Sequence, residues 1–304
     1  MTFKRVVVTG AGALTPIGNN LQQYWEGLKA GKSGAAPITR FNATLFKTKF
    51  ACEVKGFNIE DFMDRKEGRK LDPFAQYAMV VADEAIQDAN LPLAELNPDR
   101  VGVIWGSGIG GLFTFQEEVK SFAKGDGTPR FNPFFIPKMI PDLSAGHISI
   151  KYGFRGPNFV TVSACASSTN AIYDAFTYIK LGKADIIVTG GSEAAVCEAG
   201  VGGFNAMKAL SERNDSPETA SRPYDKDRDG FVLGEGAGAL ILEEYEHAKK
   251  RGAKIYAEIL GGGLSADAYH ITAPHPEGFG IIKVMQNALE DAGIKPEEVD
   301  YINT

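Results

Sequence analysis

The sequence predicts an α/β protein built from two related halves, the second of them incomplete. Short apolar strands alternate with helical segments along the 304 residues, which is typical of α/β proteins with parallel strands. KRVVVTGAGALTP at 4–16 is echoed by KIYAEILGGGLSAD at 254–267, and EAIQDANL at 84–91 is echoed by NALEDAGI at 287–294. An internal echo of this kind indicates duplication of one structural unit.

Each element of the first copy has its own signal. The opening segment predicts a strand, a glycine turn, and a helix through Tyr24 and Leu28. Residues 78–108 predict a helix, a loop and a strand, and further short strands are predicted within 184–194 and 238–244.

The second copy follows the same plan over residues 281–304, ending on a strand at DYINT. The first copy continues from the matching point for well over a hundred residues. We therefore expect residues 1–253 to form the first half, residues 254–304 to begin the second, and the chain to be cut off mid-domain.

Cys165 lies where a predicted strand at 159–163 meets a predicted helix. A thiol at this place faces unpaired N–H groups and the positive end of the helix dipole, which stabilise a thiolate. Its small neighbours leave room for a substrate, and the apolar residues that follow recur at helical spacing: Ala171, Ile172, Ala175, Phe176 and Ile179. This arrangement resembles a nucleophile elbow and predicts covalent catalysis. The alternative is an inert, buried thiol that serves only packing.

Bulk composition places the chain among globular proteins, with 44% hydrophobic and 23% charged residues. Three cysteines (Cys52, Cys165 and Cys197) make no disulfide framework and indicate a reducing compartment. The opening residues have no apolar signal-peptide core, and no later run is long enough to span a bilayer. We expect a cytoplasmic protein with no membrane partner. A net charge of −6 argues against nucleic-acid binding.

One short segment departs from this acidic balance. DRKEGRK at 64–70 concentrates Arg65, Lys66, Arg69 and Lys70 in a predicted helical stretch. Such a run is either a solvated helix face or a landing surface for an acidic partner, and the residues alone leave both interpretations open.

The glycines of VVVTGAGALTPIG invite a dinucleotide-binding interpretation, since Gly10 and Gly12 follow a strand. The fingerprint requires a third small residue where this chain has Thr15 and Pro16, and an acidic residue about 20 positions further on, which is missing. A tight turn before a helix explains the glycines, so no nicotinamide cofactor is predicted.

Asp225, Asp227 and Asp229 match the first half of a calcium loop, but the twelfth position is Gly236 instead of an acid. We expect these alternating charges to fix a turn before a strand that begins near Gly236. The histidines are His147, a structural residue in a helix; His247, on a solvent-facing helix; and His270 and His275, in a loop. None has a partner at metal-ligand spacing, so no metal site is predicted.

Several longer motifs resemble the β-ketoacyl-[acyl carrier protein] synthases, most closely the type II elongating enzymes. They are VTVSACASS around Cys165, YGFRGPN at 152–158, VTGGSEA at 188–194, VGGFNAMKALS at 201–211 and SRPYDKDRDGFVLGEGAGALILEE at 221–244. The resemblance covers essentially the whole chain.

This resemblance implies a thiolase-like fold of two α/β halves in α-β-α-β-α layers, a homodimer, and no cofactor. The family moves an acyl group from acyl carrier protein to a cysteine, decarboxylates malonyl-carrier protein, and extends the chain by two carbons. Cys165 corresponds to the acylated nucleophile, and its backbone N–H to one donor of the oxyanion hole.

The resemblance also assigns roles to other residues. Ile109 corresponds to a gate on the acyl pocket, Phe204 to a pocket wall, Phe135 to a residue lining the partner subunit's pocket, and Thr272 to a loop that approaches the active site. It assigns docking of the carrier protein to Lys66, Arg69 and Lys70, with Arg130 and Lys208 as weaker additional contacts.

One departure from the family is serious. Its two catalytic histidines, the first in a His-Gly-Thr-Ser-Thr motif that follows the strand matched by DYINT, have no counterpart in the sequence. We expect these 304 residues alone not to condense. Alternatives are a type I-like elongating synthase, a polyketide ketosynthase, a non-catalytic dimerisation or carrier-binding fragment, and, more distantly, a dehydrogenase. A chain-length factor usually lacks the cysteine, so Cys165 argues against one.

Overall fold

The computed structural model describes residues 3–303, and its centre is a six-stranded sheet in the order β5-β4-β6-β7-β1-β8. The strands are β1 (Val6–Leu14), β4 (Val101–Gly106), β5 (Asn158–Thr161), β6 (Ile186–Glu193), β7 (Gly236–Glu244) and β8 (Ala257–Ile259), while β2 (Ala36–Pro37) and β3 (Phe50–Ala51) form a separate pair. Parallel pairing, predicted for the sheet, holds only where β4 meets β5 and β6. β7 and β8 pair antiparallel with their neighbours, which makes the sheet mixed.

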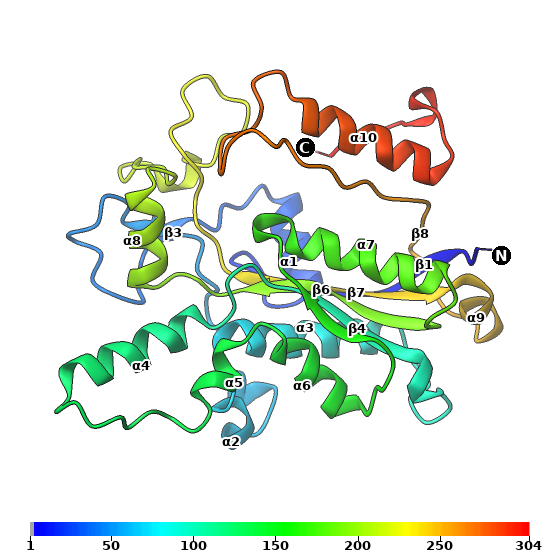
Figure 1. Cartoon of the computed structure of the whole chain (residues 1–304), viewed down its shortest axis with the longest axis horizontal. Helices are drawn as coiled ribbons and strands as arrows, with labels where there is room; N and C mark the ends of the chain where they lie inside the picture. Colours follow the sequence, from blue (N-terminus) through cyan, green and yellow to red (C-terminus); the bar gives the residue numbers. More distant parts are fainter. Residues whose placement is uncertain (1–2, 304) are drawn as a thin grey trace.

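Helices cover both faces of this sheet. They are α1 (Leu21–Lys29), α2 (Arg65–Gly68), α3 (Pro73–Asp88), α4 (Leu112–Lys124), α5 (Phe135–Met139), α6 (Leu143–Tyr152), α7 (Ser167–Lys180), α8 (Glu198–Ala206), α9 (Tyr245–Lys250) and α10 (Phe279–Ala292). Figure 1 shows α3 and α6 on one face, α7 on the other, and α10 beyond α7. Among residues 3–303, no helix has both the length and the apolar character needed to cross a membrane.

Each face of the sheet carries a hydrophobic core, because successive residues of a strand face opposite sides of the sheet. Val103 and Trp105 of β4 are buried with α3 and α6, whereas Ile104 between them is buried with Phe176 and Ile179 of α7. α7 is therefore held against the sheet along its apolar face.

The glycines near the N-terminus lie within β1, so the predicted glycine turn is wrong. A Cβ atom on Gly10 would lie 2.3 Å from the carbonyl oxygen of Ala85, and one on Gly12 would lie 2.2 Å from that of Val81. Both glycines permit α3 to pack directly on the strand. The pattern of glycines after an apolar run does not distinguish a turn from such a close approach.

The second copy repeats this close approach. A Cβ on Gly261 would lie 2.5 Å from the backbone nitrogen of Ala292, and one on Gly263 would lie 2.1 Å from the carbonyl oxygen of Val284. The glycines after β8 thus let the backbone of α10 pack directly on them, as the glycines of β1 do for α3.

A pair of aspartates repeats as well. Asp88, at the end of α3, accepts a hydrogen bond from the backbone N–H of Ala11 at 3.0 Å. Asp291, at the matching place in α10, accepts one from the backbone N–H of Gly262, also at 3.0 Å. The duplication predicted from the sequence is therefore also present in the contacts of the two units.

The predicted strand at DYINT is not formed over residues 299–303, and Thr304 lies outside the described residues. Its counterpart β4 has hydrogen-bonded neighbours on both sides, β5 and β6. No strand among residues 3–303 pairs with 299–303, so the backbone there has no sheet to join.

Candidate active site

Cys165 sits in a sharp turn between β5 and α7. A short 3₁₀ helix, Ala164–Ala166, contains it, and Ala164 adopts a left-handed conformation with φ of 51°. The Ser167 hydroxyl accepts a hydrogen bond from the backbone N–H of Ser163 at 2.9 Å and donates one to the carbonyl of Ala164 at 2.7 Å. The predicted strand–elbow–helix arrangement is confirmed, and Cys165 is exposed, which excludes the buried packing role.

The sheet comes close enough to fix the start of α7. A Cβ on Gly106 of β4 would lie 2.5 Å from the backbone of Ser167, and one on Gly191 of β6 would lie 1.9 Å from the Ser168 hydroxyl. The five apolar residues predicted to face the core do so, and Ile172, which is half-buried, also lines a cavity.

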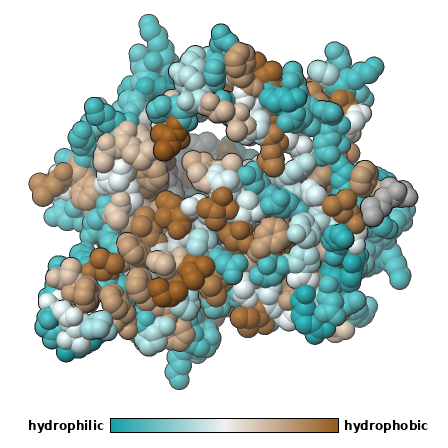
Figure 2. Space-filling model, in the orientation of Figure 1, coloured by the Kyte–Doolittle hydropathy of each residue, from teal (hydrophilic) through white to brown (hydrophobic). Residues whose placement is uncertain are grey.

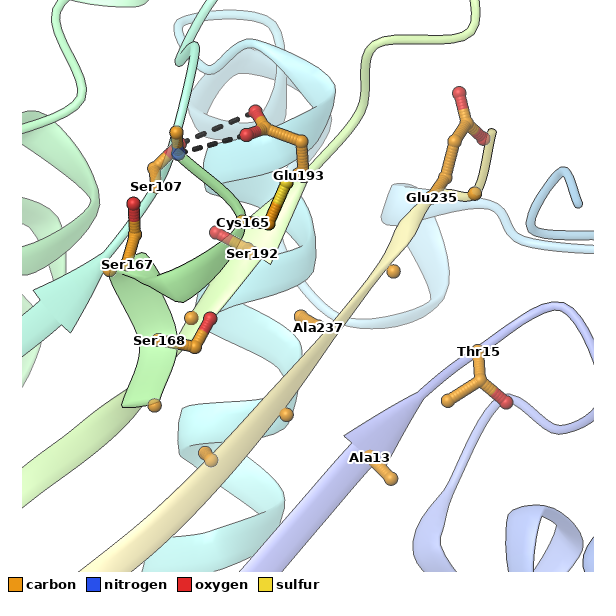
Figure 3. Close-up of a pocket in the computed structure, with 18 of the residues that line it drawn as sticks. Ala13, Thr15, Ser107, Cys165, Ser167, Ser168, Ser192, Glu193, Glu235 and Ala237 are labelled. Atoms are coloured by element: carbon orange, nitrogen blue, oxygen red, sulfur yellow. Dashed lines mark hydrogen bonds between the residues drawn. The ribbon is translucent and has the colours of Figure 1, made fainter. Parts of the chain in front are cut away.

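That cavity, of about 820 Å³, opens in front of the turn. It brings together Cys165 and two of the predicted site residues, Ile109 and Phe204. Most of its lining residues are small or apolar, and β1, β6 and β7 supply many of them. Figure 3 shows the polar exceptions, among them Ser107, Glu193 and Glu235.

Two predicted substrate-binding residues do not line this cavity. Phe135 opens α5, is half-buried, and stacks on Phe131 with ring centroids 5.5 Å apart. Thr272 lies on an exposed loop, where its backbone N–H donates to Nδ1 of His270 at 3.1 Å. The roles assigned to them stay predictions.

Glu193 is a site residue that the sequence interpretation missed. Its Oε2 accepts hydrogen bonds from the backbone N–H groups of Gly108 at 2.9 Å and Ile109 at 3.0 Å, and Oε1 lies 3.4 Å from the Ser107 hydroxyl. Burial raises the pKa of Glu193, and these donors oppose that rise. A carboxylate at the carboxyl end of a strand parallel to its neighbour was the signal that could have identified it.

Glu235 also lines the cavity, with a side chain only 2% exposed. Burial raises its pKa against the opposing effect of Arg40, whose Nη2 lies 2.6 Å from the carboxylate. The hydroxyl of Tyr77 lies 3.5 Å away. These three residues are far apart in the sequence, and no local pattern joins them.

The predicted docking residues fall into separate places. Lys66 and Arg69 are exposed on and just after α2, beside Lys70, which pairs with Glu67 at 2.7 Å. Arg130 and Lys208 are exposed elsewhere, on the loop after α4 and directly after α8. Figure 1 shows α2 and α8 well separated, so Lys208 lies apart from Lys66, Arg69 and Lys70.

The prediction that His247 faces solvent is wrong. It is half-buried, and its Nδ1 lies 2.6 Å from Oε1 of the fully buried Glu243, which Arg251 also binds. α9 begins directly where β7 ends, so its first turn packs over the end of the strand. His147 lies within α6, as predicted, and burial lowers its pKa.

Polar contacts of the aspartates fix the turn before β7, as predicted. Asp225 accepts a hydrogen bond from the backbone N–H of Asp227 at 2.7 Å, and Asp229 accepts one from that of Glu212 at 2.9 Å. Within residues 3–303, no three histidine, cysteine or acidic side chains converge in a way that could hold a metal ion. Cys52, Cys165 and Cys197 are free thiols.

Comparisons with known proteins agree with this geometry. The family "Beta-ketoacyl synthase, N-terminal domain" matches residues 3–248, and "Beta-ketoacyl synthase, C-terminal domain" matches residues 256–304. The 3-oxoacyl-[acyl-carrier-protein] synthase 2 of Synechocystis is 51% identical over 300 residues, which cover 99% of this chain and 72% of that protein.

Solved structures show the same likeness. A β-ketoacyl synthase from Burkholderia phymatum superposes with a TM-score of 0.90 and 33% identity, covering 99% of this chain and 73% of the other. A type II polyketide ketosynthase in complex with its acyl-carrier protein gives 0.85 and 34%, covering 99% and 72%. The chain belongs to the β-ketoacyl synthase family.

Proposed function

We propose that the protein containing this chain is a β-ketoacyl-[acyl carrier protein] synthase that elongates fatty acids. The observation that carries the proposal is an exposed thiol in a sharp strand–helix turn, facing a cavity of about 820 Å³ with a largely small and apolar lining. Such a cavity suits an acyl chain, and the name of the Synechocystis relative supports the reaction.

The reaction has two steps at Cys165. Its thiolate attacks the carbonyl carbon of an acyl-carrier thioester, a new carbon–sulfur bond forms, and the carrier thiol leaves. Malonyl-carrier protein then loses carbon dioxide, and the resulting carbanion attacks the acyl group on Cys165. A carbon–carbon bond forms, the cysteine sulfur leaves, and the product is two carbons longer.

The surroundings of Cys165 favour the first step. The cysteine directly precedes the first turn of α7, where the helix dipole favours negative charge. In the proposed mechanism its backbone N–H donates to the oxyanion of the tetrahedral intermediate, an interaction that contributes about 3–4 kcal/mol in comparable sites. Ile109 gates the acyl pocket and Phe204 forms part of its wall. The loop that carries Thr272 approaches the active site.

We assign docking of the acidic carrier protein to Lys66, Arg69 and Lys70. Lys66 and Arg69 are exposed and form no ion pair among residues 3–303, so their charges are available to a partner. The solved ketosynthase bound to its acyl-carrier protein supports a partner of this class. Arg130, on the loop after α4, and Lys208, after α8, act as additional contacts.

Reversing these charges tests the docking surface. The double variant Lys66→Glu/Arg69→Glu should raise KM for carrier-bound substrate about tenfold or more and leave Cys165 acylation by a small acyl thioester unchanged. Lys249→Glu on α9 is the matched control, an exposed lysine at another end of the molecule. An unchanged KM in the double variant would contradict the assignment of carrier-protein docking to these residues.

We also propose a homodimer. β5 is paired on one side only, with β4, and exposed apolar side chains gather over α4 and α5, where Figure 2 shows a brown band: Phe113, Phe115, Val119, Phe122, Phe131, Phe134 and Ile136. Unpaired edges and apolar patches of this kind are typically covered by a partner. Phe135, stacked within this band, then lines the partner's pocket. Sedimentation of the full-length protein as a monomer at micromolar concentration would exclude the dimer.

Two further assignments complete the proposal. The three free thiols favour a reducing compartment, so we place the protein in the cytoplasm. We place the boundary between the halves at 253/254, just before the C-terminal family match begins at 256.

A polyketide ketosynthase is the second candidate, since a solved relative is a polyketide ketosynthase bound to a hexaketide. One assay separates the two. Full-length protein, saturated acyl-carrier protein and malonyl-carrier protein should give a β-ketoacyl product two carbons longer, with none from Cys165→Ala and normal yield from Cys52→Ser. Repeated addition of malonyl units without intervening reduction would favour the polyketide function. Running the 304-residue chain beside the full-length protein tests the prediction that it does not condense alone.

A further inference from the structure

The loop that carries Ile109 into the cavity is rich in glycine. Gly108 precedes Ile109, and Gly110 and Gly111 follow it, with Gly110 at φ of 74°. Glycine allows many backbone conformations, so this sequence by itself does not fix the direction of the Ile109 side chain. Ile109 is 40% exposed, so packing alone holds it only partly.

Contacts on two sides supply the missing constraint. On one side the backbone N–H of Gly111 donates to the carbonyl of Met139, the last residue of α5, at 3.0 Å. On the other side a single oxygen of Glu193 receives the N–H groups of both Gly108 and Ile109. A Cβ on Gly108 would lie 3.0 Å from that oxygen and 3.1 Å from the carbonyl of Ala164, so the loop is confined between Glu193 and the turn that holds Cys165.

The charge of Glu193 is tied to this loop. Glu193 is half-buried and forms no ion pair among the residues described, so its carboxylate is compensated by the hydrogen-bond donors of the loop. If the loop moved, the carboxylate would lose those donors in a largely apolar cavity, which is unfavourable. Successive N–H groups directed at one anion form a stable backbone arrangement. Figure 3 shows hydrogen bonds from this loop to Glu193, beside Cys165.

We propose that Glu193 is a positioning residue for chain-length selection: it holds Ile109 in the cavity and thereby sets which acyl lengths Cys165 accepts. The inference rests on the proposed function, because it requires acylation of Cys165. Glu193 acts through Ile109 and does not itself take part in the acyl transfer.

The test measures rate constants for acylation of Cys165 in the full-length protein by intact mass, with butanoyl and tetradecanoyl carrier thioesters. The quantity of interest is the ratio of the two rate constants. Glu193→Ala should change this ratio about tenfold, because the gate loses its fixed place. Glu193→Gln should stay close to wild type, since its amide oxygen can accept both backbone N–H groups and its NH₂ can donate to Ser107. Glu198→Gln, on α8 outside the cavity, is the control carboxylate.

A double-mutant cycle shows whether the effect passes through Ile109. Ile109→Ala alone should change the ratio, and adding Glu193→Ala should change it no further, because the two residues act as one unit. If Glu193→Ala does not fold, Glu193→Asp replaces it, since the shorter side chain cannot reach both N–H groups.

The outcomes are distinct. A wild-type ratio in Glu193→Ala, additive effects in the cycle, or a Glu193→Gln variant as altered as Glu193→Ala would each overturn the inference and leave the proposed function intact. Absence of acylation in wild type would instead overturn the proposed function.

Discussion

The β1–α3 and β8–α10 units repeat one contact in two different settings. Both place glycines against a helix backbone and close the contact with an aspartate. β1 has nine residues and lies between two strands, and most of α3 is buried. β8 has three residues at the sheet edge, and α10 buries only Gly280. The contact is therefore encoded locally, whereas its burial depends on the rest of the fold.

The largest difference between the two units should appear when the glycines are replaced. Gly12→Val should cost about 3 kcal/mol or more in the free energy of unfolding, because its side chain meets the backbone of a buried helix that cannot shift. Gly263→Val should cost about 1 kcal/mol, because the exposed α10 can move away. Chemical denaturation of the 304-residue chain, in which α10 is exposed, measures both.

Gly238→Ala is the matched control for these variants, since a Cβ there meets nothing within 4 Å. It should change the free energy of unfolding by less than about 0.5 kcal/mol. Equal losses for Gly12→Val and Gly263→Val would show that α10 is held as firmly as α3, and the contrast drawn between the units would fail.

A smaller effect is expected at the aspartates. Burial alone would raise the pKa of Asp88, but hydrogen bonds from Lys254, Ala11 and Tyr256 hold it below its ordinary value of 3.8. Asp88→Asn should cost about 1 kcal/mol at pH 7. Since the folded pKa is depressed, this stabilisation is present above pH 3.8 and is lost as the pH falls through the folded pKa.

The measurement is the difference in unfolding free energy between wild type and Asp88→Asn as a function of pH. A difference that stays constant from pH 7 into the acid range would contradict the assignment. Asp291→Asn sharpens the comparison, because Asp291 joins Lys180 of α7 at 2.7 Å. Its loss should increase hydrogen exchange in α10 and leave α3 unaffected.

Features encoded by neighbouring residues could be predicted from the sequence. The elbow at Cys165 follows from a strand pattern, a run of small residues and a helical pattern in direct succession. The duplication follows from sequence segments that occur twice along the chain. The basic residues of α2 could be placed on a short helix for the same reason, since their positions depend only on local structure.

Features that depend on distant partners could not be predicted. Gly10 and Gly12 appeared to form a turn because the helix that packs on them begins about 60 residues later. His247 appeared exposed because its helical pattern does not reveal the buried Glu243 beneath it. Glu193 passed unnoticed because its partners, Gly108 and Ile109, lie on another strand's loop.

The most direct test of the central claim is the mass of the full-length protein after incubation with an acyl-carrier protein thioester. We predict that wild type gains the mass of one acyl group on Cys165, that Cys52→Ser gains the same mass, and that Cys165→Ala gains none. Wild type that stays unmodified, or a Cys165→Ala variant that is acylated as fully as wild type, would contradict the assignment of Cys165 as the nucleophile.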